Sequence, residues 1–106
     1  MQYINLNNIE EKEIVPGFNA RFAHSESMTF AYWNIKADAC LPGHSHHHEQ
    51  VVNMLEGEFE LTVDGEKKVL RPGDVVVIPS NATHSGKSVT DCRILDVFCP
   101  VREDYC

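Results

Sequence analysis

Short runs of apolar, aromatic and β-branched residues alternate with turn residues along the chain. Residues of these types favour β-strands. Six runs are predicted to be strands: Phe18 to Ala23, Thr29 to Ile35, Gln50 to Leu55, Glu58 to Val63, Val75 to Ile78, and Cys92 to Phe98. Turn signals such as Pro42-Gly43 and Pro72-Gly73-Asp74 separate the runs, so only short elements fit between them.

One run shows the strand period directly. Phe59, Leu61 and Val63 alternate with polar residues, which predicts a strand with one buried and one exposed face. The Asp64-Gly65 pair that follows predicts a tight hairpin with positive φ angles. Only Asn8 to Glu13 could form a helical turn. Many short strands with almost no helix predict an all-β sandwich or barrel.

Length, composition and charge narrow the class of protein. A chain of 106 residues builds one core, so we expect residues 1–106 to form a single domain. No apolar run reaches about 18 residues and the first residues lack the order of a secretory signal, which favours the cytoplasm. The formal net charge of −7 argues against nucleic acid and membranes as partners. An anionic small molecule remains compatible with a locally positive pocket.

The cysteines form neither a CxxC pair nor a disulfide framework. We therefore expect reduced thiols that mostly serve packing, at Cys40, Cys92, Cys99 and Cys106.

The stretch from Pro42 to Gln50 holds four of the six histidines. A solvated loop is the simpler interpretation of such a cluster, because a metal site needs geometry as well as composition. We interpret His47 and His48 as a solvated turn, and His24 in the same way.

Geometry limits how this stretch could bind a metal ion. In one straight strand, His44 and His46 would share a face about 7 Å apart, whereas Gln50 would lie about 20 Å from His44. Metal-bound donor atoms must lie within roughly 4 Å of one another, so a metal site requires the chain to bend between His46 and Gln50. A further ligand must come from elsewhere. His84, which follows a turn after a predicted strand, is a candidate.

Two segments resemble the paired motifs of the cupin superfamily. They read His44-x-His46-x3-Gln50-x6-Gly57, and then Pro72-Gly73-Asp74 followed by Pro79-x-Asn81-x2-His84. The resemblance implies a jelly-roll β-barrel that binds one divalent transition-metal ion. Its implied ligands are His44, His46, Gln50 and His84. The spacing back from Gly57 selects Gln50, although Glu49 is the more obvious ligand by chemistry and stays an alternative.

The ligand set limits the chemistry of the ion. Three imidazoles and a carboxamide add no negative charge, so the ion remains a strong Lewis acid toward substrate oxygen. The set also differs from the two-histidine, one-carboxylate triad of iron oxygenases. Mixed nitrogen and oxygen donors do not distinguish manganese, iron, nickel, cobalt, copper and zinc.

Two further residues are candidates for catalysis. In its predicted strand, Asp96 shares a face with Ile94 and Phe98, and burial would raise the pKa of its carboxyl toward the range for acid/base work. A structural aspartate held by backbone or arginine hydrogen bonds is the equally weighted alternative. Arg102 could return over the barrel mouth and bind a carboxylate with two hydrogen bonds, although a surface arginine is the commoner outcome.

A second resemblance runs over most of the chain. The chain is similar to KdgF-type cupins of pectin and alginate breakdown in Asn19-Ala20-Arg21-Phe22, Met28-Thr29-x-Ala31-Tyr32-Trp33 and Asp96-Val97-Phe98-x-Pro100-x-Arg102-Glu103-Asp104-Tyr105. The resemblance implies an isomerase-type conversion of ring-form 4,5-unsaturated uronates to linear keto-uronates. It places functional residues at Asp96, Phe98 and Arg102. Asp96 would then relay a proton, Phe98 would pack against the sugar ring, and Arg102 would bind the uronate carboxylate.

Other functions stay open at this point. They are a cupin dioxygenase acting on a small organic substrate, a non-catalytic metal-dependent sugar sensor, and a barrel without metal. We also expect a homodimer, because an exposed edge strand such as the amino-terminal segment could add to a neighbour's sheet.

Overall fold

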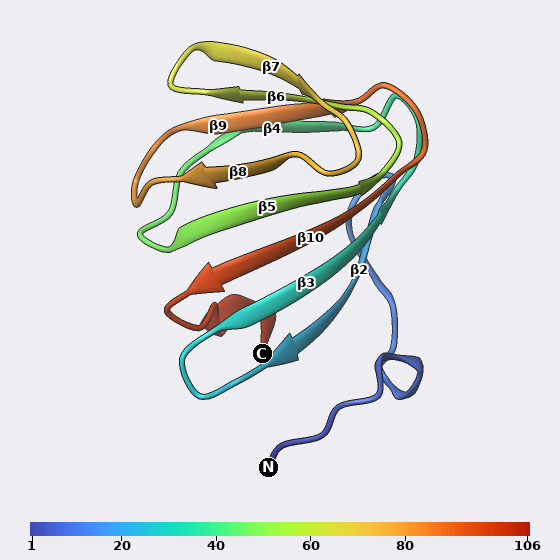
Figure 1. The fold of residues 1–106 in the computed structure, drawn as a ribbon, viewed down its shortest axis with the longest axis vertical. Helices are drawn as coiled ribbons and strands as arrows, with labels where there is room; N and C mark the ends of the chain where they lie inside the picture. The colour runs from blue at the N-terminus through green and yellow to red at the C-terminus, as the bar shows by residue number, and fades with distance from the viewer.

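The computed structural model describes residues 1–106 and shows two β-sheets packed face to face (Figure 1). Its ten strands are β1 (Lys12–Val15), β2 (Phe18–His24), β3 (Thr29–Ile35), β4 (Cys40–His44), β5 (Glu49–Glu56), β6 (Phe59–Val63), β7 (Glu66–Leu70), β8 (Val75–Ile78), β9 (His84–Ser88) and β10 (Cys92–Cys99). Two 3₁₀ turns, η1 (Leu6–Asn8) and η2 (Glu103–Tyr105), lie near the chain ends. The structure therefore contains no helix that could span a membrane.

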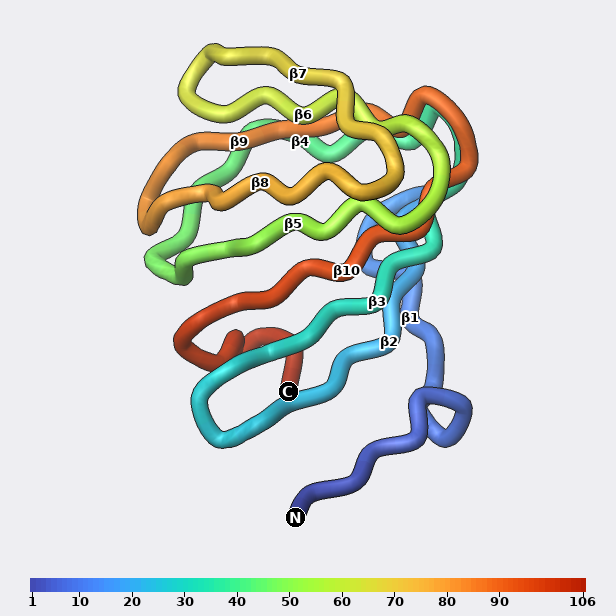
Figure 2. The backbone as a smooth tube through the Cα atoms, viewed as in Figure 1, coloured from blue at the N-terminus to red at the C-terminus, as the bar shows by residue number.

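The strand order is that of an antiparallel jelly roll. The larger sheet has the order β1-β2-β3-β10-β5-β8, and the smaller sheet has the order β4-β9-β6-β7. Figure 2 shows how β10, near the end of the chain, returns to lie between β3 and β5. The predicted all-β barrel of the jelly-roll type is confirmed.

All six predicted strands are present, and no end differs from its prediction by more than one residue. The predicted hairpin is also confirmed: Val63 pairs with Glu66, and Asp64 and Gly65 have φ angles of 47° and 84°. The predicted helical turn from Asn8 to Glu13 is wrong. The 3₁₀ turn η1 ends at Asn8, and Lys12 and Glu13 pair with β2 as part of β1.

Apolar side chains fill the space between the sheets. Phe18 makes edge-to-face contacts with Trp33 and Phe59, at ring-centroid distances of 6.0 and 6.3 Å. Gly86 on β9 packs directly under the Phe59 ring, where a Cβ atom would overlap the ring. These three aromatic residues and their neighbours form part of one buried apolar cluster between the sheets. Polar side chains, among them buried His84, Gln50 and Asp96, lie between the sheets as well.

Candidate metal centre

Three histidines converge between the sheets. His44 ends β4 and His84 begins β9, and these two residues are direct neighbours across the antiparallel pair. His46 lies in the bend between β4 and β5, where the chain turns as a shared metal site requires. One ligand nitrogen from each residue lies within 4.8 Å of the others. Donors around one ion lie within roughly 4 Å of each other, so small side-chain rotations would suffice for all three to bind it.

A shared hydrogen-bond pattern leaves one nitrogen of each ring free. Nδ1 lies 3.0 Å from a main-chain carbonyl oxygen in all three rings: Pro42 for His44, His48 for His46, and Ala82 for His84. A carbonyl only accepts, so each Nδ1 carries the proton and each Nε2 keeps its lone pair. Metal-binding histidines are commonly oriented in this way.

Burial favours the neutral form that a metal requires in two of these rings, those of His46 and His84. Burial, which is the largest cause, together with the neighbouring Arg102 and His84 lowers the pKa of His46 to about 4. Burial is also the main cause of the lowered pKa of His84. Nε2 of His84 is buried and has no hydrogen-bond partner, which a bound cation would supply. The three histidines could therefore hold a divalent metal ion.

Gln50 on β5 faces the histidines, whereas Glu49 points to solvent. Gln50 is 7% exposed, and its Oε1 lies 3.2 Å from Nε2 of His46. Since that Nε2 carries no proton, two lone-pair atoms face each other, which is the arrangement of two neighbouring ligands of one cation. If the side-chain amide of Gln50 were flipped so that its nitrogen faced His46, its N–H groups would point away from the Asp96 carboxyl that they now face. The register thus presents Gln50 to the site and keeps Glu49 outside it.

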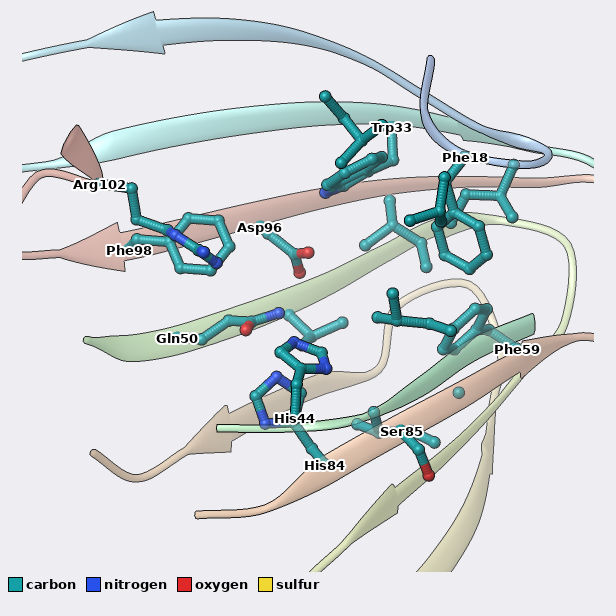
Figure 3. Close-up of a pocket in the computed structure, with 18 of the residues that line it drawn as sticks. Phe18, Trp33, His44, Gln50, Phe59, His84, Ser85, Asp96, Phe98 and Arg102 are labelled. Atoms are coloured by element: carbon teal, nitrogen blue, oxygen red, sulfur yellow. The ribbon is translucent and has the colours of Figure 1, made fainter. Parts of the chain in front are cut away.

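Asp96 lies on the inner face of β10 with Ile94 and Phe98, as the strand period predicts, and is 8% exposed. Burial raises the pKa of its carboxyl to about 7, while the Gln50 amide and the Trp33 indole, which face it, oppose this rise. Nevertheless, neither Asp96 Oδ1 nor Trp33 Nε1 has a partner that completes a well-aligned hydrogen bond. Figure 3 shows the carboxylate pointing into the space shared with Gln50 and the histidines. It is therefore not a structural aspartate satisfied by hydrogen bonds at both oxygens.

Arg102 lines the same cavity, and its side chain is only 12% exposed. The guanidinium carbon lies 5.0 Å from the Phe98 ring centroid and 4.2 Å from that of Tyr105. Asp104 accepts hydrogen bonds from Nε at 3.1 Å and from Nη2 at 2.6 Å. The Arg102 hydrogen bond is the main cause of the lowered pKa of Asp104. The expected return over the barrel mouth is thus present, together with a carboxylate partner that the sequence did not reveal.

The interpretation of His24 and His48 as solvated turn residues is wrong. His48 is only 7% exposed, and burial lowers the pKa of its ring. His24 is half-buried at the end of β2, where Nδ1 contacts the Thr29 hydroxyl and Nε2 contacts the Tyr105 carbonyl. The contact of His24 with Tyr105 joins residues distant in sequence, which local composition does not reveal. His47 is exposed, as expected.

The cysteines are all free, as predicted, but only one has the packing role that was expected of most. Cys92 is buried, whereas the other three are exposed.

Comparisons with known proteins agree with this geometry. Residues 31–98 match the family model of the cupin domain. The chain is 34% identical over 59 residues to the pectin degradation protein KdgF of Dickeya dadantii (strain 3937), a match that covers 55% of this chain and 54% of that protein. The matches to curated relatives thus span only about half of those relatives' length.

Two solved structures match over the whole chain. The structure of KdgF from Halomonas sp. has a TM-score of 0.92 and 26% sequence identity, and the match covers 100% of this chain and 99% of that one. An RmlC-like cupin from Shewanella frigidimarina NCIMB 400 has a TM-score of 0.93 and 28% identity, with 100% and 96% covered.

Proposed function

Because the chain belongs to the cupin family, we propose that it is a metal-dependent enzyme that converts ring-form 4,5-unsaturated uronates to linear keto-uronates. One observation carries the proposal: a buried carboxyl with a pKa of about 7 shares a cavity with an arginine and with His44 and His84, two of the three convergent histidines. Similarity to KdgF proteins, one of them described as a pectin degradation protein, supports a uronate as the substrate.

The residues that would hold the metal are His44, His46, His84 and Gln50. When bound to these neutral ligands, a divalent ion supplies Lewis acidity toward a sugar oxygen. The donor set does not select one transition metal.

Asp96 is suited to move the proton that the reaction requires. In ring opening, the bond between the ring oxygen and C1 breaks, and the hydroxyl on C1 loses its proton as the aldehyde forms. The ring oxygen remains on C5 as an enolate, which becomes a ketone when C4 gains a proton. Atoms and electrons balance without an oxidant, so a carboxyl that takes one proton and returns one is sufficient. The unpaired Oδ1 and the pKa near neutrality fit this role.

Arg102 and Phe98 are suited to bind the substrate. The guanidinium of Arg102 would receive the uronate carboxylate, and the Phe98 ring beside it would contact the flat face of the unsaturated sugar. Figure 3 shows both side chains at the same side of the cavity as Gln50 and Asp96.

The test is the ultraviolet absorbance of the unsaturated uronate. Purified protein loaded with metal should accelerate the loss of this absorbance, and Asp96→Asn should abolish the acceleration while the metal remains bound. Oxygen uptake during the reaction would instead identify a dioxygenase. A protein that binds the sugar with equal affinity before and after Asp96→Asn, and never turns it over, would be a sensor.

We also infer that two copies of the chain associate. The outer face of the larger sheet carries a continuous apolar row formed by Phe30, Val97, Val51 and Val77, which are direct neighbours on β3, β10, β5 and β8. A sheet that is apolar on both faces needs a cover on each, and the smaller sheet covers only one.

A further inference from the structure

The segment after β10 folds back across the end of the barrel and carries Arg102 with it (Figure 2). Two independent sets of contacts hold this segment. One set fixes its backbone, and the other fixes the guanidinium of Arg102. Neither set belongs to the metal ligands.

The backbone contacts form a chain of hydrogen bonds with one consistent assignment of protons. The main-chain N–H of Arg102 donates to the Thr29 hydroxyl oxygen at 2.9 Å, and this hydroxyl lies 2.9 Å from Nδ1 of His24. Nε2 of His24 lies 3.2 Å from the Tyr105 carbonyl oxygen, which can only accept. Nε2 therefore carries the proton, and Nδ1 accepts from Thr29. Thr29 is fully buried, so each of its contacts lies away from solvent.

The guanidinium contacts determine which edge of Arg102 remains available. Asp104 occupies Nε and Nη2 through both of its oxygens. Phe98 and Tyr105 pack against the guanidinium. An arginine has five N–H donors, so the end formed by Nη1 and the second N–H of Nη2 still has donors for another carboxylate.

We propose that Asp104, Thr29 and His24 are positioning residues that hold Arg102 with its Nη1 edge presented to a substrate carboxylate. The inference rests on the proposed function, in which Arg102 binds the uronate carboxylate. It adds that Asp104 supports this binding. The opposite role, in which Asp104 competes with the substrate for Arg102, would require the pair to separate whenever substrate binds.

Asp104→Asn distinguishes these roles by the direction of the change in KM. A positioning role predicts a KM for the unsaturated uronate that rises roughly three- to tenfold with little change in kcat, because a charge-assisted pair becomes a neutral contact. The methyl ester of the same sugar, which lacks the carboxylate charge, should show much less change. Glu103→Gln removes a neighbouring exposed carboxylate and is the matched control, for which we expect unchanged kinetics.

Thr29→Val tests the backbone contacts at nearly constant side-chain volume, with Thr62→Val as the control on another strand. It should also raise KM for the acid more than for the ester.

A KM for the acid that falls or stays constant in Asp104→Asn, or that changes equally for acid and ester, overturns the inference.

A readout that needs no turnover separates this inference from the proposed function. The Nε–H resonance of Arg102 in ¹⁵N NMR should show a restrained side chain in the wild-type protein and in Glu103→Gln, and a mobile one in Asp104→Asn. If the wild-type protein does not consume the uronate, the proposed function fails, and the NMR result alone decides whether Asp104 positions Arg102. An equally mobile side chain in all three proteins would reject that role.

Discussion

At the scale of single residues, the histidine hydrogen bonds determine which atoms face the centre of the site. Each Nδ1 is held by a carbonyl two positions away in the chain, so the orientation of each ring is set locally. The convergence of the rings depends instead on long-range pairing, in particular on the contact between His44 and His84. Loss of one imidazole should therefore remove a ligand without moving the other two.

We expect His44→Ala to lose the metal and His47→Ala to keep it. His44 offers a nitrogen to the three-histidine cluster, whereas His47 is exposed and lies outside it. In the wild-type protein, a metal concentration 100 times the Kd should stabilise the fold by about 2.7 kcal/mol, since only the folded state forms the site. His44→Ala should lose this increase in Tm. Metal analysis and melting curves with and without metal measure both effects, and full metal content in His44→Ala would show that the site is wrong.

Asp96→Asn should stabilise the metal-free protein at high pH and not at low pH. The carboxyl has a pKa of about 7 in the folded protein, raised from 3.8 by burial. The folded state thus holds a proton that the unfolded state releases, and stability falls as the pH rises from about 4 to about 7. Asparagine does not titrate. Its stabilising effect should be near zero at pH 4 and reach at most about 4 kcal/mol at pH 8, since each pKa unit corresponds to about 1.4 kcal/mol.

The difference in the free energy of unfolding between variant and wild type, measured by urea titration across this range, isolates the Asp96 contribution. The contributions of the other titrating groups to the free energy of unfolding are the same in both proteins and largely cancel in that difference. A difference that is constant with pH would mean that the carboxyl titrates normally.

Local sequence was sufficient for some site residues and not for others. The inner face of β10 follows from the alternation of its residues, which correctly predicts that Asp96 and Phe98 point into the barrel. The choice of Gln50 over Glu49 came from motif spacing, and the strand register supplies its physical reason. The contacts of His24 with Tyr105 and of Asp104 with Arg102 were missed. His24 contacts Thr29 across the neighbouring strand and also contacts Tyr105 near the end of the chain, and no pattern in the sequence links His24 to Tyr105.

At the scale of strands, prediction succeeded where one strand carries its own apolar run. The strands β4 and β9 were missed because they contain turn residues and polar side chains, in the sequences Cys40–His44 and His84–Ser88. They are strands because they pair with each other and, through β9, with β6. The strands β1 and β7 were missed because their residues are mostly charged or exposed at sheet edges. Long-range pairing determines β4 and β9, whereas β1 and β7 each pair with a neighbouring strand in a local hairpin.

Replacement by alanine should destabilise the protein far more at Gly57, between β5 and β6, than at Gly65 in the next hairpin. Gly57 and Gly65 have nearly equal φ angles of +82° and +84°, so alanine meets the same backbone strain of about 1–2 kcal/mol at each position. At Gly57 a Cβ would also overlap the carbonyl oxygen of Asp91, whereas at Gly65 no atom lies within 4 Å. Gly57→Ala should therefore cost about 1–3 kcal/mol more than Gly65→Ala.

Urea denaturation of both variants measures this difference directly. Equal losses of stability would show that the close approach of Asp91 is not maintained in solution.

At the scale of the whole molecule, the larger sheet has an outer face that matches the requirements of a self-association surface. Next to the row that contains Val97 and Val77 lies a second row, Tyr32, Leu95, Asn53 and Val75, so two adjacent rows of the face are mostly apolar. Their rim carries both signs of charge, in Arg93 and Glu56. Twisted sheets pack face to face at about −30°, and a twofold axis lets opposite charges on two identical rims meet.

Val77→Glu should convert the predicted dimer to a monomer. Val77 is 55% exposed on the edge strand β8, so a glutamate there costs the single chain little, but it would place two unpaired carboxylates in a paired interface. Val89→Glu is the matched control, because Val89 is 44% exposed and lies outside the strands of this face. Light scattering at micromolar concentration should give twice the chain mass of 12.0 kDa for wild type and Val89→Glu, and the single-chain mass for Val77→Glu. A wild-type protein of single-chain mass would exclude the dimer, and a dimeric Val77→Glu would place its interface elsewhere, with the amino-terminal edge strand β1 as the next surface to alter.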